Sequence, residues 1–350
     1  MPGYQTRRTF IKRDQLLPTT NANGKLKRNL SLVVLVVQNS TLVLMMRYSR
    51  IVQKPGQSMY IASTAVFLAE VLKIIACLFV MYRQQRYWSK FILVVRNEIL
   101  GKPAETAKML IPSSLYALQN NLLYVALSNL EAATFQVTYQ MKILSTAIFS
   151  VVLLGRSLSR SKWLALVLLM IGVTLVQSQS MSTPPPDDTV QSPFIGLVAV
   201  ITSCISSGFA GCYFEKILKT SETSMWVRNI QLGISGAFFS LVGMLMYDMQ
   251  PLRQGGMLQG YDWLTWVVIG NQALGGLLVA IVVKYADVIL KSFATSISLI
   301  LSSAISFYFF DFQLSMQFVV GACIVILATY NYSVPDKKVL TPPTATTKPH

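Results

Sequence analysis

Apolar residues occur along the chain in long runs, each separated from the next by a short polar stretch. A run of about 20 such residues can cross the hydrocarbon core of a bilayer as an α-helix. At Asn129–Leu130 and Asp311–Phe312 almost no loop remains, so the helices joined there must be antiparallel neighbours. The pattern predicts an all-α integral membrane protein with ten transmembrane helices, at residues 30–48, 58–82, 107–128, 131–154, 162–180, 194–216, 227–247, 262–283, 286–309 and 313–333.

Residues 181–193 divide the expected helices into two sets of five. The segment is acidic and rich in proline, which cannot continue a helix. Because five is odd, the second set must cross the membrane in the opposite sense. Inverted repeats are common in transporters and place the binding site between the halves. We expect two inverted five-helix halves, 30–180 and 194–334; the halves share no strong residue identity, so this expectation rests on counting helices.

Basic residues are concentrated on one side of the expected topology. With the N-terminus in the cytosol, the cytosolic segments hold 22 Lys and Arg, against four on the opposite side. Cytosolic loops of membrane proteins carry this excess. We therefore expect a basic cytosolic tail at residues 1–29, a lumenal linker at 181–193 and a disordered cytosolic tail at 335–350.

Composition narrows the function further. The 350 residues are 53% hydrophobic and only 13% charged. The net charge of +16 is explained by basic loops, so no nucleic-acid partner is expected. The only histidine is His350, and the four cysteines form no C-x-x-C pair, so we expect no metal and no cofactor. The chain also lacks a phosphate-binding G-x-x-x-x-G-K-[ST] loop and an extramembrane segment long enough for a catalytic domain, so we expect no enzyme.

Lys142 and Lys291 lie inside expected helices, one in each half. Lys142 has no acidic residue within one turn, whereas Lys291 follows Asp287 by four residues and is within reach of it. A charge at a helix centre costs about 2.5–3.5 kcal/mol on insertion scales, so such side chains face the bundle interior or a wet cavity. Two compact cations suit a diphosphate. The alternatives are ion pairs, for Lys142 with an acid on another helix and for Lys291 with Asp287.

Further polar, aromatic and glycine residues inside the expected helices are candidates to line the same cavity. Amides match a nucleobase edge or sugar hydroxyls, aromatic rings can stack on a base, and glycines allow close backbone approach. Glu70 and Lys73 share one helix face and form either an internal ion pair or part of the cavity. Helix packing is the alternative for the others, which are Tyr116, Gln119, Asn120, Phe135, Tyr139, Gly208, Asn229 and Gln231.

These residues stand in stretches that resemble the nucleotide-sugar transporter family, within the drug/metabolite transporter superfamily. The similar branch is that of UDP-galactose, UDP-N-acetylglucosamine and CMP-sialic acid carriers. The resemblance implies a Golgi location and exchange of cytosolic nucleotide sugar for lumenal nucleoside monophosphate. It also implies phosphate contacts at Lys142 and Lys291 and a nucleotide pocket at Gln119 and Asn120. The stretches include Ala69-Glu-Val-Leu-Lys73, Tyr116-Ala-Leu-Gln-Asn-Asn-Leu, Phe135-Gln-Val-Thr-Tyr-Gln-Met-Lys142 and Val282-Val-Lys-Tyr-Ala-Asp.

Two positions depart from the CMP-sialic acid carriers, which resemble one another in having Tyr where this chain has Phe135 and Gly233. Both departures favour a UDP-sugar, UDP-galactose and/or UDP-N-acetylglucosamine, exchanged for UMP. Other nucleotide sugars, a membrane enzyme, a cation exporter and a non-transporting accessory protein of glycosyltransferases are the competing hypotheses. Self-association of the carrier also stays open.

Overall fold

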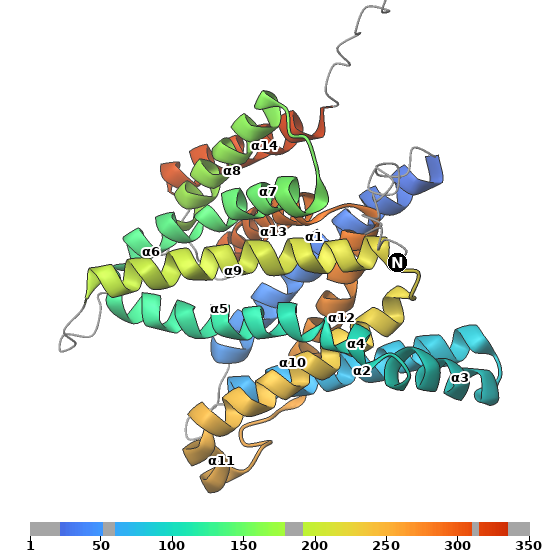
Figure 1. Ribbon diagram of the computed structural model, residues 1–350. Helices are drawn as coiled ribbons and strands as arrows, with labels where there is room; N and C mark the ends of the chain where they lie inside the picture. The colour runs from blue at the N-terminus through green and yellow to red at the C-terminus, as the bar shows by residue number, and fades with distance from the viewer. Residues whose placement is uncertain (1–21, 52–59, 179–191, 310–314, 335–350) are drawn as a thin grey trace, which may run out of the picture.

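The computed structural model describes residues 22–51, 60–178, 192–309 and 315–334, and within these ranges the chain forms helices and no strand. Figure 1 shows the long helices lying side by side in one bundle. Nine helical spans in the described ranges are long and apolar enough to cross a membrane. They comprise α1 (Ala22–Ile51), α2 (Ala62–Gln85), the consecutive α6 (Ala132–Tyr139) and α7 (Met141–Leu154), α8 (Arg160–Ser178), α9 (Pro193–Thr220), α10 (Met225–Tyr247), α12 (Trp263–Tyr285), α13 (Val288–Phe309) and α14 (Met316–Ser333).

The third expected helix is present as α5 (Leu110–Asn129), but it is not among the nine. Its 20 residues are long enough to cross about 30 Å of hydrocarbon. Three consecutive amides, Gln119 to Asn121, lower its hydropathy. α5 packs along α9 near the centre of the bundle (Figure 1). The all-α prediction is confirmed, while the ten-helix count and the inverted repeat stay predictions.

The fifth and tenth expected helices, α8 and α14, cross at a pair of glycines (Figure 1). A Cβ added to Gly172 would lie 3.0 Å from the Gly321 carbonyl oxygen, and one added to Gly321 would lie 2.8 Å from the Gly172 carbonyl oxygen. Only hydrogen fits at this approach, so the two backbones touch. The crossing joins the last helix of each expected half.

The connections contain short helices that the hydropathy pattern does not predict. Between α2 and α5 the chain forms α3 (Trp88–Val95), a π-helical turn (Arg96–Leu100) and α4 (Pro103–Ala107), and α11 (Met249–Gly255) follows α10. α3 and α11 lie toward opposite ends of the bundle (Figure 1). α1 also begins at Ala22, within the expected polar tail. The expected linker, except Ser192 and Pro193, and the tail 335–350 lie outside the described residues.

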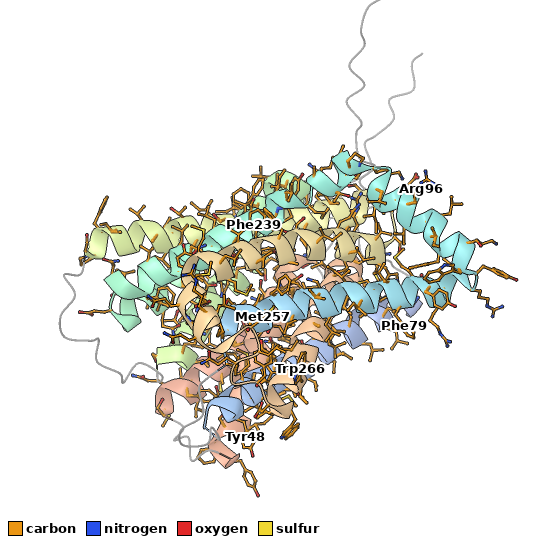
Figure 2. All side chains as sticks on the ribbon, turned by 90° about the horizontal axis from the view of Figure 1, so that it is seen from below. Tyr48, Phe79, Arg96, Phe239, Met257 and Trp266 are labelled. Atoms are coloured by element: carbon orange, nitrogen blue, oxygen red, sulfur yellow. The ribbon has the colours of Figure 1, made fainter. Side chains whose placement is uncertain are left out.

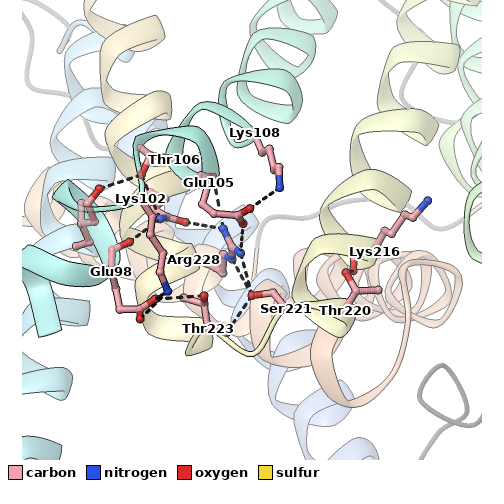
Figure 3. Close-up of polar contacts among 12 residues, drawn as sticks. Glu98, Lys102, Glu105, Thr106, Lys108, Lys216, Thr220, Ser221, Thr223 and Arg228 are labelled. Atoms are coloured by element: carbon pink, nitrogen blue, oxygen red, sulfur yellow. Dashed lines mark hydrogen bonds and ion pairs between the residues drawn. The ribbon is translucent and has the colours of Figure 1, made fainter. Parts of the chain in front are cut away.

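Arg228 is buried at the start of α10 and joins that helix to the connection after α3 (Figure 3). Its guanidinium donates to a Glu105 carboxylate oxygen at 2.6 Å and to Gln231 Oε1 at 3.0 Å. Gln231 Nε2 in turn donates to the Thr106 hydroxyl at 3.1 Å. Hydrogen bonds from Lys108 and Arg228 hold the pKa of Glu105 below its usual range. Gln231, a binding candidate in the sequence, is therefore occupied by this network.

The outside of the bundle is apolar. Phe79, Trp266 and Tyr48 are among the exposed large side chains, with 63%, 49% and 45% of their surface exposed, and Figure 2 shows them on different helices. A soluble protein rarely exposes apolar side chains over so many of its helices. The interior instead collects polar groups, including Gln140, Gln231 and Glu215, each at most 1% exposed. A membrane protein is expected to show this distribution, because lipid covers the outside and polar groups pair within.

Candidate functional site

The helix that carries Lys142 is interrupted at Gln140, two residues before it. α6 ends at Tyr139, α7 begins at Met141, and the backbone amide of Gln140 bonds to the Val137 carbonyl at 3.2 Å, a tighter turn than that of an α-helix. The Gln140 side chain is buried and donates to Gln177 Oε1 on α8 at 2.8 Å. Interrupted membrane helices are typical of the binding sites of transporters. Because of this break, Lys142 lies on the first turn of α7.

The ammonium of Lys142 lies 3.9 Å from the centroid of the Tyr139 ring. A cation over an aromatic face is stabilised by the ring quadrupole, but its charge is not neutralised. Among the described residues, no carboxylate lies within ion-pair distance of Lys142. The alternative that an acid on another helix neutralises this lysine is therefore not found in the described part of the chain.

Three further predicted residues gather around Tyr139. Its ring stacks on Phe135, with centroids 5.5 Å apart and planes at 12°. Gln119 on α5 donates from Nε2 to the Tyr139 hydroxyl at 3.4 Å. The Oε1 atom of Gln119 is buried and has no hydrogen-bond partner in the described structure. Gln119, Phe135, Tyr139 and Lys142 thus form one cluster, with a stacked aromatic face, a cation and an unused acceptor.

Lys291 lies on the first turn of α13, where Ile289 packs in one core cluster with Ile143, the residue after Lys142 on α7. The ion pair with Asp287 that the sequence allows does not form. Asp287 accepts a hydrogen bond from the Leu290 backbone amide at 2.7 Å and pairs with Arg156 at 3.4 Å. The two predicted lysines, one from each half of the chain, therefore lie in one region without an acid between them.

Two other predicted residues of α5 differ in their surroundings. Tyr116 lies one turn before Gln119, and its hydroxyl oxygen is 3.9 Å from where a Cβ on Gly211 would lie. Asn120 is exposed and points to a different side of α5 from the buried Gln119. The structure therefore places Tyr116 between α5 and α9, near the cluster, and does not bring Asn120 to it.

Four further predicted residues form a second group on α2 and α10. Glu70 and Lys73 make an ion pair, which was one of the two alternatives. A Cβ on Gly233 would lie 2.8 Å from Ile74 Cγ1, so this glycine is needed for α10 to approach α2. Asn229 is buried, donates to the Met225 carbonyl at 3.1 Å and leaves its Oδ1 without a partner in the described structure.

α9 contributes one predicted residue, Gly208, and one group that carries no signal in the sequence, Cys204. Gly208 brings α9 against α7, where its added Cβ would lie 2.8 Å from the Thr146 backbone nitrogen. Cys204, on the same helix, donates from Sγ to the Tyr139 carbonyl at 3.4 Å. The sequence marks Cys204 only as an apolar packing residue. No hydropathy or spacing rule distinguishes a cysteine that lies against a binding site from one in the core.

A cavity of about 420 Å³ lies elsewhere, at the beginning of α2 and the end of α10. Its lining includes Tyr60, Ser63, Asp248 and Gln259, and none of the predicted site residues. Within the described ranges no three His, Cys, Asp or Glu side chains come together to hold a metal ion. The cluster around Lys142 is therefore the candidate site, and its chemistry suits an anion with an aromatic group.

Comparison with known proteins agrees with this chemistry. Residues 23–333 match the nucleotide-sugar transporter family. The chain is 53% identical over 312 residues to the UDP-N-acetylglucosamine transporter of Mus musculus, covering 88% of this chain and 95% of that protein. It is 51% identical over 318 residues to the UDP-galactose translocator of Mus musculus, covering 91% and 80%. A solved crystal structure at 11% identity shares the fold, with a TM-score of 0.61 over 87% of this chain and 96% of that chain. The chain belongs to the nucleotide-sugar transporter family.

Proposed function

We propose that the chain is a Golgi antiporter that carries UDP-N-acetylglucosamine and/or UDP-galactose from the cytosol in exchange for lumenal UMP. The observation that supports this most is Lys142, held over the Tyr139 ring without a carboxylate partner among the described residues. Uncompensated cations inside a membrane bundle are costly unless a ligand supplies the opposite charge. A diphosphate supplies it.

The rest of the cluster suits the nucleoside. The stacked rings of Phe135 and Tyr139 offer an aromatic face to a base. The buried Oε1 of Gln119 lacks a donor, and the N3–H of uracil is one. A buried polar atom costs about 1–3 kcal/mol while it has no partner, so the donor that satisfies it gains selectivity.

Exchange follows from the same charges. Lys142 on α7 and Lys291 on α13, two helices that pack together, repel each other in an empty site of low dielectric, so the vacant carrier should reorient slowly. Either a UDP-sugar or UMP removes the repulsion and allows the halves to move. Net transport of one then requires return of the other, and relatives named for both UDP-N-acetylglucosamine and UDP-galactose support a UDP-linked passenger.

The test is counterflow uptake by the purified full-length protein in liposomes loaded with UMP. We expect uptake of UDP-N-acetylglucosamine or UDP-galactose to exceed that of CMP- and GDP-sugars and to need internal UMP. Lys142→Ala should abolish it, while Lys284→Ala, which removes an exposed lysine at the end of α12, should keep it. Near-normal exchange by Lys142→Ala refutes the assigned role, and no exchange by the wild type favours the accessory-protein hypothesis.

A further inference from the structure

The segment from Arg83 to Leu100, here called the α3 segment, protrudes with the end of α2 from one end of the bundle (Figure 1). Arg86 ends α2 in a left-handed conformation, with φ of 59°, and so turns the chain into α3. One side of the segment packs inward, where Phe91, Val94 and Ile99 contact the core cluster of Met81 and Val227. This packing holds the segment against the bundle.

The other side of the α3 segment is apolar and exposed. Trp88, Leu93 and Leu100 expose 62%, 57% and 72% of their surface, and Ile92 exposes 47%. Large exposed apolar patches are unfavourable in water and mark surfaces that contact a membrane or a partner. Tryptophan and tyrosine are enriched where a bilayer meets water, and Tyr87 beside Trp88 is 66% exposed.

The same segment carries four exposed cations, Arg83, Arg86, Lys90 and Arg96. Figure 2 shows Arg96 at the outer edge of the bundle. The only acid in the segment is Glu98, which is neutralised by Lys102 at 2.9 Å. The exposed face is therefore apolar and positive at once, the combination that holds helices at the surface of anionic bilayers.

We propose that the α3 segment is a membrane-surface site that binds the headgroups of anionic phospholipids in the cytosolic leaflet. Its apolar side chains contact the outer part of the acyl chains, and its guanidinium and ammonium groups contact the phosphates. The basic residues of the loops assign this end to the cytosol, and the cytosolic leaflet is the one that carries anionic lipid. The site does not depend on the proposed transport activity.

The residues that follow α3 connect the proposed lipid site to the rest of the bundle by hydrogen bonds. The Glu98 carboxylate accepts from the Thr223 hydroxyl at 3.3 Å, and the Glu98 carbonyl accepts from Gln231 Nε2 at 3.3 Å (Figure 3). Gln231 bonds to the buried Arg228 of α10. An anchor on α3 therefore restrains the beginning of α10 as well as the connection itself.

The test measures lipid retained by the full-length protein after purification, by native mass spectrometry with phosphatidylserine or phosphatidylcholine added. We expect the wild type to retain phosphatidylserine preferentially and R83Q/K90Q/R96Q to retain at least about tenfold less, since each surface cation contributes several-fold to binding of anionic lipid. The matched variant K25Q/K27Q/R28Q removes three cations from the beginning of α1 and should keep the wild-type preference. Equal losses in the two variants, or no preference in the wild type, would overturn the proposal.

A second measurement keeps the test independent of how well the triple variant folds. In liposomes, the fluorescence that Trp88 contributes is the difference between the wild type and W88F. Brominated phosphatidylserine should quench this contribution more strongly than brominated phosphatidylcholine. Equal quenching by the two lipids, or none by either, would contradict a site for anionic headgroups at α3.

Discussion

The Lys142 ammonium is centred 3.9 Å from the Tyr139 ring, so the cation of the candidate site rests on an aromatic face rather than on an acid. A carboxylate partner would compete with an anionic ligand for this charge. A ring stabilises the cation by about 0.5–2 kcal/mol and leaves its charge available. The same ring stacks on Phe135, and its hydroxyl accepts a hydrogen bond from Gln119. Tyr139 therefore holds the cluster together.

Replacing Tyr139 separates its two roles. Tyr139→Leu removes the ring under Lys142, and we expect counterflow uptake at low substrate concentration to fall about tenfold or more, in line with the stabilisation that such a ring provides. Tyr139→Phe keeps the ring and loses only the hydroxyl that accepts from Gln119. Its uptake should fall less than about threefold, since that bond is long and neutral.

The measurement is the initial rate of exchange in UMP-loaded liposomes containing equal amounts of folded protein. Equal losses in the two variants would show that the hydroxyl, and not the ring, is what matters. Unchanged rates in both would remove Tyr139 from the site.

The sequence singles out the two lysines because a charge inside an apolar run has few explanations. Their surroundings were harder to predict. Asp287 is four residues from Lys291 and in reach by spacing, yet it caps α13 and pairs with Arg156. Spacing along one helix cannot rank partners from other segments. The cation that pairs with Asp287 is Arg156, which follows α7. For the same reason, Gln231 was a binding candidate, although Arg228 and Thr106 occupy it.

Hydropathy predicts the long helices, and its signal is weaker where a helix contains several polar residues. α5 carries three adjacent amides and still forms 20 helical residues, because its neighbours α9 and α10 cover it. α3 escapes prediction for the opposite reason. Its eight residues are apolar but too few to span a bilayer, and the basic residues on both sides resemble a loop.

The glycine crossing of α8 and α14 makes a prediction for stability. Gly321→Ala places a Cβ 2.8 Å from the Gly172 carbonyl oxygen and from Leu175 Cβ, so the helices must separate. We expect a loss of about 1–3 kcal/mol, the usual cost of overpacking, seen as a lower melting temperature in detergent. Gly270→Ala is the control, because no atom lies within 4 Å of its added Cβ. A melting temperature of Gly321→Ala equal to that of Gly270→Ala would contradict this contact.

Asp262, at the beginning of α12, should contribute to the stability of the fold in a pH-dependent way. Its carboxylate accepts from the Thr265 hydroxyl and backbone amide, both at 2.7 Å, and these bonds hold the pKa of Asp262 below its usual value. A lowered pKa means that the folded state favours the ionised form. The contribution is therefore present at neutral pH and is lost as the pH falls through the lowered pKa. Asp262→Ala should cost about 1 kcal/mol at pH 7 and progressively less in acid, as followed by thermal unfolding. A difference from the wild type that does not change with pH would contradict the role of the carboxylate.

Glu215 lies fully buried on α9 and neutralises two cations. It pairs with Arg156, which follows α7, and with Lys219 at 2.7 Å, and it accepts from the Val288 backbone amide at 3.0 Å at the beginning of α13. Glu215→Gln keeps the shape of the side chain and removes its charge. We expect a loss of about 3–5 kcal/mol, because the largely buried Lys219 then loses its carboxylate and Arg156 keeps only Asp287. Glu222→Gln, at an exposed position of the next loop, should change stability by less than about 0.5 kcal/mol.

The pairing itself is tested by removing both charges. If the cost of Glu215→Gln comes from the cation left behind, then adding Arg156→Gln should destabilise the protein by less than the sum of the two single changes. Thermal unfolding of the four proteins in the same detergent gives this difference. Additive losses would mean that Glu215 acts through Lys219 or its bond to the Val288 amide, which do not involve Arg156.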